Sequence, residues 1–276
     1  MSRARIEQRF AALKAEGRAA FVAYVMAGDP DAETALEILQ GLPAAGADLI
    51  ELGFPFSDPM AEGPPIQRAC QRALAKGMTL AGSLELVRRF REGDSTTPLI
   101  LMGYLNPLLT PGLERFAADA AKAGVDGLII VDCPPEEADP LADALDANDI
   151  ALIRLATPTT DEARLKVVAR RTSGFVYYVS VAGVTGVKEA DAAVVAPQVE
   201  KVRRASGLPV AVGFGIKTPE RAAAVARVAD AVVVGSALVE EIAGALGRNE
   251  SPAPKVLDTA RRLAQAVRDA RVSATV

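Results

Sequence analysis

The sequence predicts an α/β fold, namely a (β/α)8 barrel with an extra N-terminal helix. Short apolar segments alternate with amphipathic segments along the whole chain of 276 residues. This alternation is typical of βαβ units and a parallel sheet. Eight such units fit the usual length of the barrel, about 250 residues. A doubly wound sheet is the main alternative. Because no low-complexity linker divides the sequence, we expect one domain over residues 1–276.

The expected elements begin with the extra helix at residues 3–16. The strands are short segments rich in Val, Ile, Leu and Ala, at 21–26, 49–52, 99–102, 127–131, 151–155, 175–179, 210–212 and 231–234. The helices carry apolar residues at helical spacing, at 32–45, 80–91, 112–123, 136–147, 161–171, 192–206, 219–227 and 255–271. Prolines and glycines in 53–63 interrupt both patterns, so helix is expected to resume near Ile66.

Composition excludes several classes of function. The chain has no histidine, which removes Ser-His-Asp and Cys-His catalysis and the commonest zinc ligand. We expect no metal and no cofactor. Cys70 and Cys133 lack metal or redox spacing and are expected to be reduced thiols in a cytoplasmic protein. A net charge of −4 gives no basis for binding nucleic acid or a membrane surface, and no signal peptide or membrane span is expected.

The most informative segment is DLIELGFPFSDPMAEGPPIQ, at residues 48–67. It places Glu51 in an apolar strand, where an unpaired ionised carboxylate costs several kcal/mol of desolvation. Glu62 lies in the proline-rich loop that follows, with the chain folded back between the two. Both carboxylates are therefore expected to face one cavity and to serve in acid/base chemistry.

Unusual residues cluster where the predicted strands end, which is where such barrels carry their active sites. They are Tyr104, Asn106, Asp132, Cys133 and Tyr177. Glycines dominate the last three of these loops, in SVAGVTG (180–186), GFG (213–215) and GS (235–236). Small residues let backbone N–H groups approach a phosphate, and a helix start after Ser236 adds a favourable dipole. The late loops therefore predict a phosphate site.

Several motifs, in this order, resemble the α subunit of tryptophan synthase: VMAGDP (25–30), ELGFPFSDPMAEGP (51–64), MGYLNP (102–107), GVTG (183–186), GFGI (213–216) and GSA (235–237). The resemblance covers nearly the whole chain. It implies a carbon–carbon lyase of tryptophan biosynthesis, which cleaves indole-3-glycerol phosphate in a retro-aldol reaction to indole and glyceraldehyde 3-phosphate. It further implies an α2β2 complex in which indole passes to a β subunit. That subunit carries pyridoxal phosphate, so none is implied for this chain.

The resemblance also implies roles for single residues. Glu51 matches the general acid/base, and Tyr177 matches a tyrosine that hydrogen-bonds and orients it. Glu62 stands where the family commonly has Asp, a carboxylate that accepts the indole N–H. Val181 stands where many members have Arg, four positions before the threonine of a mobile loop that closes over substrate.

The remaining implied contacts fall into three groups. Substrate contacts are implied for Tyr24, Met102, Tyr104, Thr185 and Phe214. Phosphate contacts are implied for Gly186, Gly215, Gly235 and Ser236. Contacts with the β subunit are implied for Pro55, Asp58, Pro59 and Asn106.

Two alternative functions remain open at this point. One is a different phosphate-binding barrel enzyme, an isomerase or a Schiff-base aldolase, for which Lys217 is the tempting nucleophile although a solvated lysine explains it better. The other is a non-catalytic barrel that only activates the β subunit, suggested by the departures at Glu62 and Val181. A pure scaffold has no need to hold Glu51 in an apolar strand.

Overall fold

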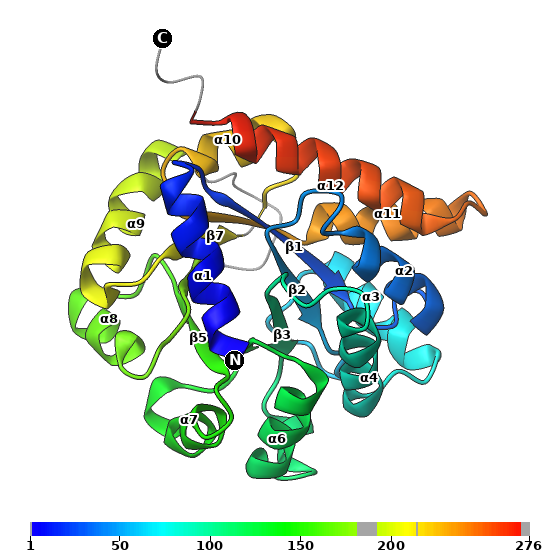
Figure 1. The fold of residues 1–276 in the computed structure, drawn as a ribbon, viewed down its shortest axis with the longest axis horizontal. Coiled ribbons are helices and arrows are strands. Elements are labelled where there is room, and N and C mark those ends of the chain that lie inside the picture. The colour runs from blue at the N-terminus through cyan, green and yellow to red at the C-terminus, as the bar shows by residue number, and fades with distance from the viewer. Residues whose placement is uncertain (1, 181–191, 214, 272–276) are drawn as a thin grey trace.

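Eight parallel strands close into a barrel in chain order, from β1 to β8 and back to β1. The computed structural model describes residues 2–180, 192–213 and 215–271. The closed sheet confirms the predicted (β/α)8 or TIM barrel and excludes the doubly wound sheet (Figure 1). The strands are β1 Ala20–Met26, β2 Leu49–Gly53, β3 Leu99–Gly103, β4 Gly127–Ile130, β5 Ala151–Ala156, β6 Val176–Val179, β7 Val210–Gly213 and β8 Ala231–Val234.

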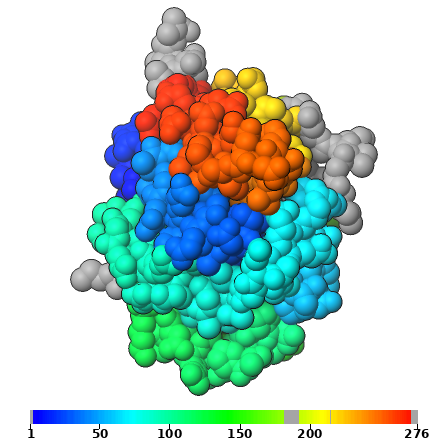
Figure 2. Space-filling model, turned by 90° about the vertical axis from the view of Figure 1, so that its right-hand side faces the viewer, coloured from blue at the N-terminus to red at the C-terminus, as the bar shows by residue number. Residues whose placement is uncertain are grey.

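Helices surround the barrel on the outside, except for α1, which lies across one end (Figure 1). They are α1 Ser2–Ala15, α2 Ala32–Gly41, α3 Pro64–Ala75, α4 Leu80–Arg91, α5 Asn106–Leu109, α6 Leu113–Ala123, the 3-10 turn η1 Pro135–Glu137, α7 Asp139–Asp146, α8 Glu162–Ala169, α9 Ala192–Ser206, α10 Pro219–Ala226, α11 Ser236–Gly247 and α12 Pro252–Asp269. α2 contacts α12, and α3 contacts α11. Figure 2 shows this side, where the first helices of the chain (blue, cyan) meet the last (orange, red).

The predicted helix boundaries were wrong mainly at prolines. α3 begins at Pro64 and α12 at Pro252, both earlier than expected, because proline fits the first turn of a helix, where its missing N–H would have no partner. The helix expected at 136–147 instead begins as η1 and continues as α7 from Asp139. The short α5 was not predicted, and neither was the full extent of α11, although its start at Ser236 was.

The barrel interior is filled from one end. Alternate residues of the strands point inward, among them Leu49, Ile100 and Ile153. They form one apolar cluster with Phe175, directly before β6, and with Ile6, Phe10 and Leu13 of α1. The rings of Phe10 and Phe175 lie 5.7 Å apart. α1 therefore closes the end of the barrel at which the strands begin, and the opposite end is left for a site.

Ion pairs with one buried carboxylate stabilise the closed end of the barrel. Asp126, fully buried before β4, accepts hydrogen bonds from Arg5 of α1 at 2.6 Å and from Arg91 of α4 at 2.7 Å. It also accepts the backbone N–H of Leu99 at 2.8 Å. One carboxylate thus ties two helices and a strand together. None of the helices in the described part of the chain is long and apolar enough to cross a membrane.

Candidate active site

Glu51 lies inside the barrel near the carboxyl ends of the strands. Leu49 belongs to the interior cluster, whereas Ile50 and Leu52 belong to the outer one, so strand alternation points Glu51 inward. The side chain is fully buried, and neither carboxylate oxygen has a hydrogen-bond partner in the described part of the chain. Burial, with a smaller contribution from Glu62, raises the pKa of Glu51 to about 8. A carboxyl group of this kind holds its proton at neutral pH and is ready to donate it.

Glu62 lies in the loop between β2 and α3, and the structure brings it close enough to Glu51 for the two charges to repel each other. Burial raises the pKa of Glu62 to about 7. The loop turns tightly here, because the N–H of Glu62 donates to the carbonyl of Pro59 at 3.1 Å. The two carboxylates are therefore close enough to interact, and the cavity that both are expected to face stays a prediction.

Tyr177 reaches the same environment from β6, on the far side of the barrel. Its ring is nearly buried, and burial, followed by the charges of Glu51 and Glu62, raises the pKa of its phenol well above the usual value. The phenol therefore stays protonated and is available as a donor. It makes no hydrogen bond to Glu51 in the structure, since the oxygens of Glu51 have no partner there. The contact expected between the two residues is absent from the described structure.

Tyr24 lies on β1 directly opposite Glu51 of β2 in the strand register. A Cβ atom placed on Gly53 would come 2.3 Å from the Tyr24 hydroxyl, and one placed on Gly235 would come 3.1 Å from the ring. The tyrosine therefore extends between the end of β2 and the loop after β8. Burial, followed by the charge of Glu62, raises the pKa of its phenol. Tyr24 thus lies between the carboxylates and the predicted phosphate site.

Met102 and Tyr104, at the end of β3, differ in burial and in the contacts they make. Met102 is half-buried and packs against both apolar clusters. Tyr104 is 2 % exposed, and its hydroxyl accepts the backbone N–H of Ala61 at 3.0 Å. Its ring lies 5.2 Å from that of Phe56. Tyr104 is therefore fixed to the loop that carries Glu62, a contact that the sequence did not predict.

Two of the glycines expected to hold phosphate, Gly215 and Gly235, follow β7 and β8. α11 begins directly after Gly235 and has no side-chain hydrogen bond at its N-cap, which leaves its first N–H groups open to an anion. Gly215 has φ +75° with open space around its Cα, so the backbone conformation, not crowding, requires glycine there. Val181, Thr185, Gly186 and Phe214 lie outside the described residues.

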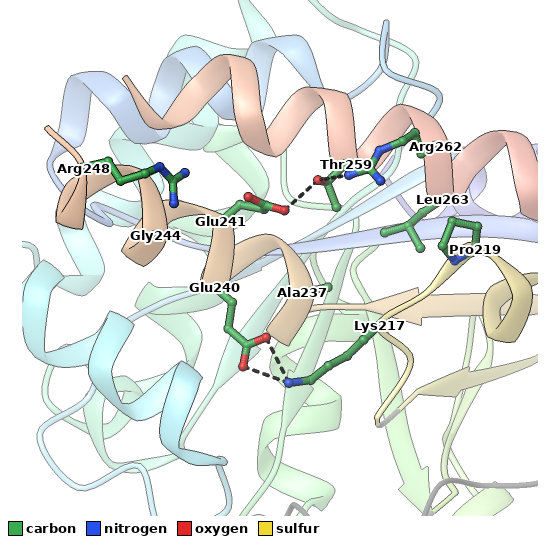
Figure 3. A pocket seen from close by; sticks show the side chains of 10 residues that line it. All are labelled: Lys217, Pro219, Ala237, Glu240, Glu241, Gly244, Arg248, Thr259, Arg262 and Leu263. Atoms are coloured by element: carbon green, nitrogen blue, oxygen red, sulfur yellow. Dashed lines mark hydrogen bonds and ion pairs between the residues drawn. The ribbon is translucent and has the colours of Figure 1, made fainter. Parts of the chain in front are cut away.

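Lys217 lies in a surface cleft of about 300 Å³ and is half-exposed (Figure 3). The cleft is formed by α11, α12 and the start of α10. The Lys217 ammonium is 2.9 Å from each carboxylate oxygen of Glu240. An exposed, ion-paired ammonium is a poor nucleophile, because Schiff-base chemistry needs the neutral amine. The pair instead ties the loop after β7 to α11, which are the two segments that carry Gly215 and Ser236.

The residues expected to contact a partner are not all at the surface. Asp58 and Asn106 are exposed and Pro59 is partly so, whereas Pro55 is buried, which argues against a direct contact there. Two apolar residues in the same region were missed: Met60 is 75 % exposed and Leu109 is 53 % exposed. For Met60, the sequence offered one signal of exposure, an apolar methionine within a polar, proline-rich loop. The described ranges contain no cluster of three potential metal ligands, and both cysteines are free.

The fold and these residues define a class: a (β/α)8-barrel enzyme with a buried carboxyl group at the carboxyl ends of its strands. The family model of the tryptophan synthase alpha chain matches residues 10–268, and the chain belongs to that family. Members of this family are lyases that act on indole-3-glycerol phosphate.

Named relatives extend over almost the entire chain. The tryptophan synthase alpha chain of Phenylobacterium zucineum is 78 % identical over 273 residues, which are 99 % of each chain. That of Caulobacter vibrioides is 75 % identical over 272 residues, again 99 % of each. The crystal structure of tryptophan synthase subunit alpha from Legionella pneumophila is similar with a TM-score of 0.89 and 42 % identity, covering 95 % of this chain and 98 % of that one.

Proposed function

We propose that Glu51 is the general acid/base of a retro-aldol cleavage of indole-3-glycerol phosphate to indole and glyceraldehyde 3-phosphate. The observation that carries the proposal is the buried carboxyl group of Glu51, which has no hydrogen-bond partner in the described chain and a pKa of about 8. Such a group costs stability, and a reaction that needs a proton donor inside the barrel accounts for it.

The reaction uses one proton in a cycle. Glu51 delivers its proton to C3 of the indole ring, which leaves positive charge spread toward the ring nitrogen. The bond between C3 and the side chain then breaks, and its electron pair restores the aromatic ring. The adjacent side-chain hydroxyl becomes the aldehyde of glyceraldehyde 3-phosphate as its proton passes to the Glu51 carboxylate. Glu51 ends the cycle as it began, protonated.

Glu62 stabilises the charge that develops on the ring. Its carboxylate accepts a hydrogen bond from the indole N–H, and this bond strengthens as positive charge reaches the nitrogen. Tyr177 donates to Glu51 when that carboxylate is ionised. Tyr24, Met102, Tyr104, Thr185 and Phe214 surround the substrate, and Gly186, Gly215, Gly235 and Ser236 hold its phosphate.

The assembly that we propose is an α2β2 complex in the cytoplasm, in which indole passes to a β subunit. Support comes from the exposed side chains of Met60, Leu109, Asp58 and Asn106 near the ends of adjacent strands β2 and β3. Large apolar side chains at a surface commonly mark a protein interface. The two free cysteines fit a reducing compartment.

The test is the release of glyceraldehyde 3-phosphate from indole-3-glycerol phosphate, with and without a cognate β subunit. We expect turnover by the wild type and a loss of at least about 100-fold in Glu51→Gln, the scale of general acid/base catalysis. Glu114→Gln, at an exposed position of α6, is the matched control and should keep wild-type turnover. An unchanged rate in Glu51→Gln would reject the role of Glu51.

Turnover by neither wild type nor complex would reject the lyase itself. Activation of the β subunit without turnover would then favour the non-catalytic partner. Borohydride trapping of a substrate on a lysine would favour the Schiff-base aldolase, which the Lys217–Glu240 ion pair argues against.

A further inference from the structure

We propose that Gln67 is a positioning residue for the second carboxylate, and that it acts through the backbone of Glu62. The proposal rests on the role assigned above to Glu62. The side-chain amide of Gln67 donates to the backbone carbonyl of Glu62 at 2.9 Å. Gln67 belongs to the first turns of α3 and reaches back past the helix start to make this bond.

A second side-chain hydrogen bond holds the backbone just before Glu62. The backbone N–H of Ala61 donates to the Tyr104 hydroxyl at 3.0 Å. This bond holds the peptide group between Met60 and Ala61, and the Glu62 N–H, which donates to the carbonyl of Pro59 at 3.1 Å, holds the peptide group directly before the Glu62 Cα. Side chains from two different elements, α3 and the end of β3, thus hold the backbone around Glu62. With both sides held, the direction in which the Glu62 side chain leaves the backbone is fixed as well.

Both anchors are themselves held firmly. α3 buries Ile66, Ala69, Cys70 and Ala73 against the barrel. Arg72 of the same helix forms a two-pronged ion pair with Asp29, at 2.6 and 2.8 Å, and Asp29 is fully buried. Tyr104 is 2 % exposed. The hydrogen bonds made by Gln67 and Tyr104 thus connect the backbone around Glu62 to packed parts of the barrel, although Glu62 itself lies in an irregular loop.

The chemistry of an amide suits this task. A lysine or arginine at position 67 would reach the carboxylate as well as the carbonyl and would neutralise the charge needed by the indole N–H. Glutamine donates to the carbonyl and leaves that charge available. Positioning matters because a displacement of about 1 Å in an active site can cost about 100-fold in rate.

The experiment is a double-mutant cycle on turnover of indole-3-glycerol phosphate. Gln67→Met removes the donor while keeping the side-chain length. We expect kcat to fall about 10-fold with KM changed less than about 2-fold, because the contact acts on the reacting charge. Gln71→Met, an exposed position on the same helix, is the matched control and should keep the wild-type kcat.

The cycle separates positioning from general structural support. In a Glu62→Gln background, Gln67→Met should change kcat less than about 2-fold, because the charge that it positions is gone. An equal loss in both backgrounds would overturn the proposal. The thermal unfolding of each variant is measured as well, so that a lower kcat caused by unfolding is distinguished from one caused by lost positioning.

A measurement that needs no catalytic turnover tests the positioning role of Gln67 separately from the proposed lyase function. Carbon-13 NMR of labelled glutamate follows the titration of Glu62 in the free chain. Gln67→Met should move the Glu62 midpoint by about half a pH unit or more, because the carboxyl group changes its surroundings, whereas Gln71→Met should not. A moved midpoint in a chain without lyase activity would reject the function and keep the positioning, and an unmoved midpoint would overturn the positioning.

Discussion

Gly213 leaves the space that the hydroxyl of Tyr177 occupies. A Cβ atom on Gly213 would lie 2.0 Å from that oxygen, far inside van der Waals contact. The two residues are on adjacent strands, β7 and β6, and the carbonyl of Gly213 also accepts the hydroxyl of Ser180 at 2.9 Å. The glycine at the end of β7 therefore determines how far the Tyr177 phenol extends toward the carboxylates.

Gly213→Ala is expected to displace Tyr177 and to lower kcat by about 10- to 100-fold, because the phenol can no longer reach its place beside Glu51. Steady-state kinetics of indole-3-glycerol phosphate cleavage measure the effect. Gly247→Ala, where a Cβ atom would meet nothing within 4 Å, is the control and should be neutral. Equal activity of the two variants would show that the position of Tyr177 does not matter for the reaction.

The pH dependence of kcat/KM, which reports ionisations of the free enzyme, should be bell-shaped. The reaction needs one carboxyl group protonated and the other ionised, and the pKa values are about 8 for Glu51 and about 7 for Glu62. Because the two carboxyl groups interact, the apparent pKa values of the acid and alkaline limbs of the profile belong to the pair and not to either residue alone. Activity should fall below about pH 7 as Glu62 gains a proton and above about pH 8 as Glu51 loses its own. Glu62→Gln should remove the acid limb, and an acid limb that persists in this variant would contradict the assignment.

Glu51→Gln should stabilise the protein at alkaline pH while it removes activity. The pKa of Glu51 is about 8 in the folded state, against an ordinary value of 4.5. The folded chain therefore binds this proton more tightly than the unfolded chain, and folding becomes less favourable as the pH rises between these two values. Glutamine has no proton to lose. Urea unfolding at pH 9 should show the variant more stable on the order of a few kcal/mol, with a smaller difference at pH 5. A variant that is less stable at pH 9 would contradict the burial argument.

Asp126→Asn should destabilise the fold by about 3–5 kcal/mol, because it leaves the partly buried cations Arg5 and Arg91 without their carboxylate. The ion pairs lie at the closed end of the barrel, so the folded fraction should keep its wild-type KM. Denaturant unfolding and kinetics at low temperature test the two parts. Asp119→Asn, in exposed pairs at 3.7 and 3.9 Å, should change stability by less than about 0.5 kcal/mol. Similar losses in both variants would contradict the role of Asp126.

The barrel fold could be predicted from the sequence because the residue patterns that mark its strands are local. Each expected strand differs from the observed one by at most one residue at either end. Runs of Val, Ile, Leu and Ala between helical patterns mark such strands strongly. Helix starts were harder to predict, because a proline such as Pro252 suggests a break although it fits the first turn.

The candidate active site could be predicted from the sequence only in part. Glu51 stood out because a carboxylate in an apolar strand demands an explanation. The hydrogen bond from Ala61 to Tyr104 joins residues 43 positions apart, and no local pattern contains it. The burial of Pro55 and the exposure of Met60 likewise depend on how the loop folds over the barrel end. Contacts between distant segments are properties of the packed structure.

The most direct test of the central claim is the transfer of a proton to C3 of indole. In D2O, with indole and glyceraldehyde 3-phosphate present, each cycle of the reversible reaction should place a solvent deuteron on C3, which proton NMR detects as loss of the C3 signal. The wild type should catalyse this exchange, and folded Glu51→Gln should not exceed the rate without enzyme. Exchange by Glu51→Gln at the wild-type rate would show that another group carries the proton.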